Sequence, residues 1–245
     1  MGNCLSANGT INLCDIVVRP NVPPEQPMSA ETIRQGLTNV AAILNSKHQN
    51  ISIIAVGGAV NSLLLHTRES TGDVDFFYRT KTKHEDVTKV IVAAKSAATT
   101  LKLGDQWLNN HTAIFIEVCW VDLQIYLLSS YKQEDSIERL YDEAVTQNEI
   151  VFNAPGLTVY AAPWRYALGT KLDRLSKPGA KSYDMSDAVG YLERLIAKRG
   201  GKPVKKSEIK AWAQEFKFTV ATDKLMGSLG EAYKKKTGKD GVIEG

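Results

Sequence analysis

Two aspartates, Asp73 and Asp75, flank a single valine and are followed by three aromatic residues. Side chains two residues apart lie on one face of a β-strand, so the pattern predicts that both carboxylates project together while Val74 turns into the core. Two neighbouring carboxylates repel each other unless a cation lies between them. Because hard divalent ions prefer oxygen ligands, the pair predicts a site for Mg²⁺ or Mn²⁺.

A glycine pair lies upstream of the aspartates. Residues 51–56 are mostly β-branched and aliphatic, which predicts a buried strand. Gly57 and Gly58 then allow a sharp turn or the close approach of a ligand to the backbone. A helix is predicted over 59–66, and its first turn would point free N–H groups toward the glycines. Such a corner is a ready site for an anion.

A phosphate cradle facing a two-carboxylate metal site is the layout that phosphoryl or nucleotidyl transfer needs. The order of Gly-Gly, helix, polar loop and Asp-x-Asp also resembles the first motif of the nucleotidyltransferase-fold (DNA polymerase beta-like) superfamily. It is most similar to the branch that contains AbiEii-type toxins and related uncharacterised nucleotidyltransferases. Fourteen residues separate Gly58 from Asp73, slightly more than in that pattern, which indicates a small insertion.

The resemblance implies an α/β (α+β) fold with a mixed-sheet nucleotidyltransferase core flanked by helices. The expected divisions are an N-terminal arm (1–27), the core (28–162) and a helical C-terminal region (163–245). The resemblance also implies that a third carboxylate on a neighbouring strand completes the metal site. Asp122 is the better match, because its flanks read as a strand on both sides, and Glu117 is the alternative.

A second element in the helical region resembles the same branch: a Lys-Leu on one helix, then a basic-x-x-Asp-x-x-Asp entry to the next helix. The matching residues are Lys171, Lys181, Asp184 and Asp187. Lys171 could reach a triphosphate as a point charge, and Asp184 near a helix start suits the helix dipole. We expect Asp184 or Asp187 to pair with Lys171 or Arg174. The alternative interpretation is a helix cap with surface ion pairs.

The resulting hypothesis is a metal-dependent nucleotidyltransferase that moves a nucleoside monophosphate from a triphosphate, such as ATP, to an acceptor hydroxyl and releases pyrophosphate. Asp73 and Asp75 would bind two Mg²⁺ or Mn²⁺ ions, and Asp122 would share the catalytic ion and help to deprotonate the acceptor. The expected nucleotide-binding residues are Gly57, Gly58, Arg68, Lys171 and Asp187. The acceptor is left open among RNA, protein and a small molecule.

Two alternatives belong to other functional classes. One is a protein with the same fold that binds a nucleotide or a protein without catalysis. The other is a membrane-tethered interaction protein, because the sequence Met-Gly-Asn-Cys-Leu-Ser fits the pattern for myristoylation at Gly2 with palmitoylation at Cys4. In a eukaryote, two acyl chains would anchor the chain stably at a membrane surface.

The composition is ordinary for a globular protein, with 43% hydrophobic and 23% charged residues among 245. Its net charge is only +3, but residues 190–245 hold 13 Lys and Arg against 7 Asp and Glu. That basic end could hold a polyanion or could simply aid solubility. No apolar run is long enough to span a bilayer, no secretory signal is found, and the three cysteines show no metal or disulfide spacing. We therefore expect a cytoplasmic location.

Other common chemistries find no support in the sequence. The four histidines form no zinc-binding cluster, and no P-loop motif is present.

Periodicity and capping residues predict the elements that position these groups. Helices are expected over 29–46, 82–103, 136–147, 164–175, 183–199, 207–216 and 222–236. Strands are expected at 149–153 and 157–161, and residues 107–129 are expected to hold two strands or one bent strand that ends in the apolar run 121–128. The end of the chain, residues 234–245, is expected to fray.

Overall fold

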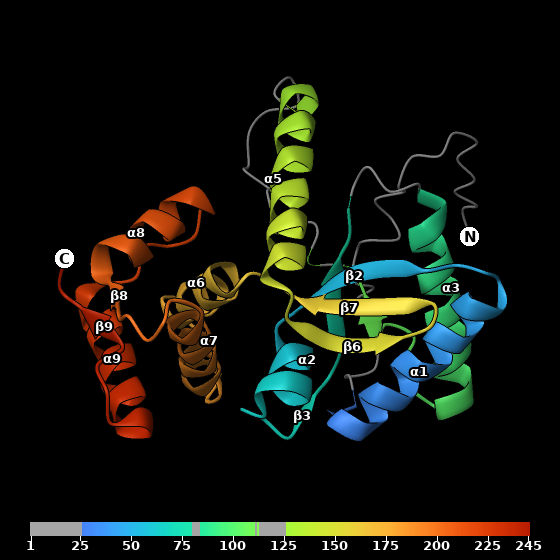
Figure 1. Ribbon diagram of the computed structural model, residues 1–245, viewed down its shortest axis with the longest axis horizontal. Coiled ribbons are helices and arrows are strands. Elements are labelled where there is room, and N and C mark those ends of the chain that lie inside the picture. Colours follow the sequence, from blue (N-terminus) through green and yellow to red (C-terminus); the bar gives the residue numbers. More distant parts are fainter. Residues whose placement is uncertain (1–25, 80–83, 111, 113–125) are drawn as a thin grey trace.

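The computed structural model of the protein describes residues 26–79, 84–110, 112 and 126–245. It is a mixed α/β structure built around a five-stranded sheet with the order β5-β4-β2-β7-β6 (Figure 1). The strands are β2 (Ile51–Val56), β4 (Val74–Phe77), β5 (Leu108–Asn109), β6 (Ile150–Ala154) and β7 (Leu157–Ala161). The central strand β2 runs antiparallel to β4 and parallel to β7.

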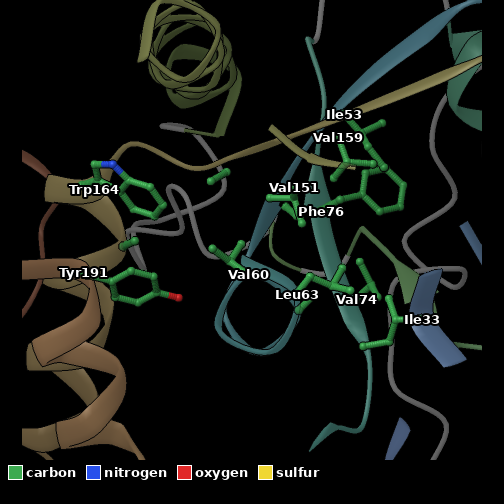
Figure 2. Packing of buried hydrophobic residues seen from close by; sticks show 14 of the residues in the cluster. Ile33, Ile53, Val60, Leu63, Val74, Phe76, Val151, Val159, Trp164 and Tyr191 are labelled. Carbon is green, nitrogen blue, oxygen red and sulfur yellow. The ribbon is translucent and has the colours of Figure 1, made fainter. Parts of the chain in front are cut away.

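Two helices cover one face of this sheet. They are α1 (Ala30–Ser46) and α3 (His84–Leu101). The sequence explains α1, because apolar residues recur at helical spacing and are buried, and because the hydroxyl of Ser29 accepts a hydrogen bond from the Thr32 backbone N–H at 3.2 Å. Ile33 and Leu37 of α1 pack in one cluster with Ile53 and Phe76 of the sheet (Figure 2). These contacts form the main core.

The opposite face of the sheet packs against α5 (Tyr126–Gln147). Ile54, Val56 and Phe77 alternate with the residues of the first core and contact Ile137 and Leu140 of α5. Strand β2 is therefore buried on both sides, which explains its near-continuous apolar sequence.

The helical C-terminal region lies beside the sheet (Figure 1). Its helices are α6 (Trp164–Leu175), α7 (Asp184–Lys198), α8 (Lys206–Glu215) and α9 (Asp223–Thr237), each within two residues of the predicted range. Thr222 caps α9 by accepting a hydrogen bond from the Leu225 N–H at 3.2 Å. Gly238 ends α9 at φ +74°, in the left-handed conformation that favours glycine.

Two sequence-based predictions of local structure are wrong. The run 121–128 was expected to be a strand, but Tyr126 already begins α5; a short apolar run does not distinguish a strand from the first turns of a buried helix. The C-terminal end was expected to fray, yet β9 (Val242–Ile243) pairs in parallel with β8 (Val204–Lys205). Val242 packs against the main core, which gives this end an apolar anchor.

The segment between β2 and β4 forms the approach to the candidate site. It contains α2 (Gly58–Val60), a π-helical turn η2 (Asn61–Leu65) and β3 (Ser70–Thr71). β3 pairs antiparallel with β1 (Met28–Ser29), which ties the segment to the start of α1. Within the described part of the chain, the helices are too short or too polar to cross a membrane.

Candidate functional site

The glycine corner and the aspartate pair meet at one end of the sheet. In the β2–β4 ladder, Val56 lies directly opposite Asp75, and the chain turns at Gly57 immediately afterwards. Gly57 has φ +66° and ψ −132°, a conformation that a residue with a side chain adopts only under strain. The space beside Gly57 is open, because a Cβ built there would meet no atom within 4 Å. The register of two strands thus brings together residues that lie almost twenty positions apart.

The two aspartates flank a valine that is wholly buried in the main core. Alternation along β4 directs Asp75 to the same face as Phe77, which packs toward α5. Asp73 lies immediately before the strand. Both aspartates are half-buried. The side-chain amide of Asn109 on β5 donates a hydrogen bond to Asp73 Oδ2 at 3.3 Å.

The charge of Asp75 acts on a neighbouring tyrosine of α6. Burial, and secondarily the negative charge of Asp75, raise the pKa of Tyr166 above its ordinary value.

The predicted third carboxylate, Asp122, and its alternative Glu117 lie outside the described residues, as do Gly2 and Cys4. Within the described ranges, no three His, Cys, Asp or Glu side chains gather into a possible metal site. The part of the predicted metal site that the structure describes is therefore the pair Asp73 and Asp75. The carboxylates of Asp73, immediately before β4, and of Asp75, on β4, are donors of a kind that suits Mg²⁺ or Mn²⁺.

The carbonyl of Gly57 is held by three hydrogen bonds. It accepts from the Asn61 side-chain amide at 2.8 Å, from the Tyr191 hydroxyl at 3.1 Å and from the Asn61 backbone N–H at 3.3 Å. Asn61 and Tyr191 are wholly buried, and Asn61 Nδ2 also lies 2.6 Å from the Tyr191 oxygen. Helix α7 therefore fixes a peptide group in a turn 134 residues upstream.

The second glycine is required by packing. A Cβ at Gly58 would lie 1.9 Å from the Thr71 hydroxyl oxygen, which leaves no room for a side chain. The same position lies 3.2 Å from Nη1 of Arg68, so the guanidinium group borders the glycine corner. Arg68 also stacks on the Tyr183 ring, with Cζ 3.8 Å from the ring centroid.

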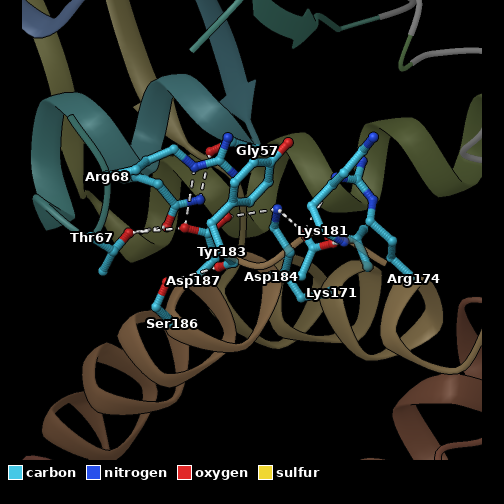
Figure 3. A network of polar contacts seen from close by, with 12 residues as sticks. Gly57, Thr67, Arg68, Lys171, Arg174, Lys181, Tyr183, Asp184, Ser186 and Asp187 are labelled. Carbon is cyan, nitrogen blue, oxygen red and sulfur yellow. Dashed lines mark hydrogen bonds and ion pairs between the residues drawn. The ribbon is translucent and has the colours of Figure 1, made fainter. Parts of the chain in front are cut away.

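Arg68 is tied to α7 through Asp187 (Figure 3). Its Nη2 and Nε both donate to the Asp187 carboxylate, the latter at 3.3 Å. Burial alone would lower the pKa of Arg68, but the hydrogen bonds and charge of Asp187 outweigh it and the pKa is raised, so the guanidinium stays charged. The Thr67 hydroxyl, 3.0 Å from Asp187 Oδ1 and 2.9 Å from Asn61 Oδ1, shares its one proton between two acceptors.

Lys171 lies behind this contact and bridges two buried carboxylates. Its Nζ is 2.8 Å from Asp187 Oδ2 and 3.1 Å from Asp184 Oδ1. The side chain of Lys171 is 5% exposed and those of both aspartates are 0% exposed. Asp184 also accepts from the backbone N–H of Lys181 at 2.8 Å and pairs with Arg174 at 3.3 Å. We name Arg68, Lys171, Asp184 and Asp187 the inner ion network.

The structure thus confirms the expected pairing of Asp184 and Asp187 with Lys171, and of Asp184 with Arg174. The alternative, surface ion pairs, is wrong for Lys171 because its partners are fully buried. Lys181 contributes its backbone rather than its side chain.

Five residues at the site were not predicted: Asn61, Thr67, Asn109, Tyr183 and Tyr191. One sequence signal could have identified Asn61, since it and Ser62 are the two polar residues within an otherwise apolar run, and a buried amide needs partners. Tyr191 gave no signal, because a tyrosine on the apolar face of a helix is ordinarily a core residue.

The fold and the site define a mixed α/β protein in which a carboxylate pair lies beside a glycine corner held by a C-terminal helix. The chain belongs to the family described as Domain of unknown function (DUF7582), whose sequence model matches residues 26–240. No curated protein and no solved structure matches the chain. The family match spans both the sheet and the helical region, so both halves of the candidate site lie within one family unit.

Proposed function

We propose that the protein is a metal-dependent nucleotidyltransferase with the nucleotidyltransferase fold. The single observation that supports this most is the β2–β4 register, which sets Asp75 beside the residue that precedes Gly57 and Gly58. A carboxylate pair next to an open glycine turn offers oxygen ligands for a metal and backbone for a phosphate within one small region. The guanidinium of Arg68 at the same corner adds a permanent positive charge.

In this proposal, Asp73 and Asp75 hold Mg²⁺ or Mn²⁺, and Asn109 orients Asp73 through its amide. A bound metal supplies charge stabilisation for the attacking and leaving oxygens. The glycine corner and Arg68 bind the phosphate chain of the nucleotide. The acceptor hydroxyl gives up its proton, with Asp122 as the expected base, and its oxygen forms a bond to the α-phosphorus. The bond between that phosphorus and the bridging oxygen of the β-phosphate breaks, and pyrophosphate leaves.

In this scheme Lys171 does not bind the triphosphate directly, although its charge suggested that it would. Its ammonium group lies between Asp184 and Asp187, so it orients Asp187, which in turn orients Arg68. Arg68 is the direct phosphate ligand of the pair, and Lys171 positions it.

The proposal predicts that Asp75→Ala abolishes nucleotide transfer while the protein stays folded. Purified protein is incubated with Mg²⁺ or Mn²⁺, each labelled nucleoside triphosphate, and total RNA or cell lysate, and the labelled macromolecule is identified. Loss of one metal carboxylate should lower the transfer rate by orders of magnitude. Asp105→Ala, at an exposed aspartate outside the site, serves as the matched control and should transfer normally. Unchanged transfer by Asp75→Ala would refute the proposal.

A nucleotide-binding protein without catalysis is the second candidate. It is favoured by one observation: the two cations nearest the corner are already paired with buried carboxylates, which reduces the positive charge left to stabilise a transition state. Calorimetry separates the two functions. Binding of a metal–nucleotide complex without any labelled product would favour the binding protein, and labelled product would favour the enzyme.

A further inference from the structure

The orientation of one peptide group decides what the glycine corner presents to a ligand. The carbonyl of Gly57 points toward Asn61 and Tyr191, from which it accepts three hydrogen bonds. The described residues contain no cis peptide bond, so the N–H of Gly58 points away from that carbonyl. As the first residue of α2, Gly58 has no acceptor for its N–H within the helix.

We propose that Tyr191 and Asn61 are positioning residues, which hold the Gly57–Gly58 peptide so that the Gly58 N–H faces the phosphate chain of the nucleotide. This inference rests on the proposed function and names residues that act through the backbone rather than by touching the ligand. Because the N–H donor is already oriented before an anion binds, binding requires no rearrangement of the backbone.

The surroundings of Tyr191 suit it to this role. Its ring stacks on Trp164 with centroids 5.9 Å apart, which fixes the direction of the hydroxyl (Figure 2). Burial, and secondarily the charge of Asp187, raise the pKa of Tyr191, so the phenol keeps the proton that it donates. The neighbouring Gly190 brings α7 close, since a Cβ there would lie 2.8 Å from Thr67 Cγ2.

Asn61 completes the arrangement from the other side of the carbonyl. Its amide nitrogen reaches both Gly57 and Tyr191, while its Oδ1 faces the Thr67 hydroxyl at 2.9 Å. Each polar atom of the amide thus has a partner, as a buried amide requires. The glycine peptide is therefore linked through Asn61 and Thr67 to the inner ion network.

The test replaces only the hydroxyl of Tyr191, with Tyr191→Phe. Three quantities are measured: the ¹H–¹⁵N resonance of the Gly58 amide in the ligand-free protein, the affinity for inorganic triphosphate with Mg²⁺, and the affinity for Mn²⁺ alone. We expect the Gly58 resonance to move, triphosphate binding to weaken about tenfold, and Mn²⁺ binding to stay unchanged. Tyr233→Phe, at a buried tyrosine of α9, is the matched control and should leave all three unchanged.

The outcomes distinguish this inference from the proposed function. Tyr191→Phe protein that binds triphosphate as tightly as the wild type overturns the inference alone, as does an equal loss of Mn²⁺ and triphosphate binding, which a general structural defect would cause. Wild-type protein that binds no triphosphate overturns the proposed function, and the inference with it. If Tyr191→Phe does not fold, the wild type decides: a Gly58 resonance that shifts on adding triphosphate supports the inference, and one that stays still overturns it.

Discussion

Two groups of ion pairs join the C-terminal helices to earlier parts of the chain, and they differ in burial. The inner ion network links Arg68, before β3, to α6 and α7 through carboxylates that are 0% exposed. The outer ion network, formed by Arg139, Glu143, Arg165 and Glu215, links α5, α6 and α8. Its carboxylates are about 30% exposed, at 32% for Glu143 and 29% for Glu215.

The hydrogen bonds of the outer ion network have the short distances expected of paired charges. Arg165 binds Glu143 in a bidentate manner at 2.6 and 2.7 Å, contacts Glu215, and lies over the Phe216 ring. Exposed pairs nevertheless contribute little to stability, because water and salt screen them. Buried pairs cost desolvation and are weak evidence for stability, yet removing one partner leaves an uncompensated charge. The inner network therefore suits the positioning of a site, and the outer network suits the attachment of helices.

The largest predicted loss of stability follows when one charge of the inner ion network is removed. Asp187→Asn should lower the free energy of unfolding by about 3–5 kcal/mol, because Arg68 and Lys171 lose the buried carboxylate that both contact. Urea denaturation followed by circular dichroism measures this. A cost no greater than that of the same change in the outer network would remove the distinction between the two networks.

A smaller change in the free energy of unfolding is expected when acid protonates Asp184. Burial alone would raise the pKa of Asp184, but the Lys181 backbone N–H and the Lys171 ammonium outweigh it, so its pKa is lowered. Because its pKa is lowered in the folded state, Asp184 stabilises the folded protein at pH values above the ordinary aspartate pKa of about 3.9. This stabilisation is lost as the pH falls through the pKa that Asp184 has in the folded protein.

The stability advantage of the wild type over Asp184→Asn should therefore be constant from about pH 7 to about pH 5 and shrink below about pH 4. Denaturation at a series of pH values gives this difference directly. An advantage that grows as the pH falls would contradict the lowered pKa.

The smallest effect is predicted in the outer network. Glu143→Gln should lower the free energy of unfolding by about 1 kcal/mol or less, because the pair with Arg165 is partly exposed. The loss should shrink further in about 1 M salt, which screens exposed charges within a few ångströms. This variant is also the matched control for Asp187→Asn, since both exchange a carboxylate that binds an arginine for an amide. A loss of unfolding free energy above about 3 kcal/mol would show that the Glu143 pair behaves like the buried pairs of the inner ion network.

Short sequence patterns were sufficient to predict most of the helices and strands. The range of β2 was predicted from an apolar run, and that of α6 from periodicity and capping residues. In each case a feature within a few residues specifies the structure. The prediction failed at Tyr126–Leu128, where an apolar run without punctuation suits either a strand or a helix.

The candidate site was less predictable, because its defining contacts are distant in sequence. Spacing predicted that Asp73 and Asp75 share a strand face, and the resemblance of the second element led to the expectation that Lys171 pairs with a carboxylate, which the structure shows. The register of β2 and β4 places Gly57 directly after the residue opposite Asp75. The contact of Tyr191 with Gly57 depends on how α7 packs against η2, which no pattern in either segment specifies. The functional assignment of all these residues remains a prediction.

The π-helical turn η2 has a consequence for chain length. A π-turn holds one residue more than an α-helical turn would, so a single inserted codon can create it without disturbing the strands on either side. Family members one residue shorter here are expected to carry regular helix, rotated by about 100° after the missing position, and would present a different residue to the helix that carries Asp187.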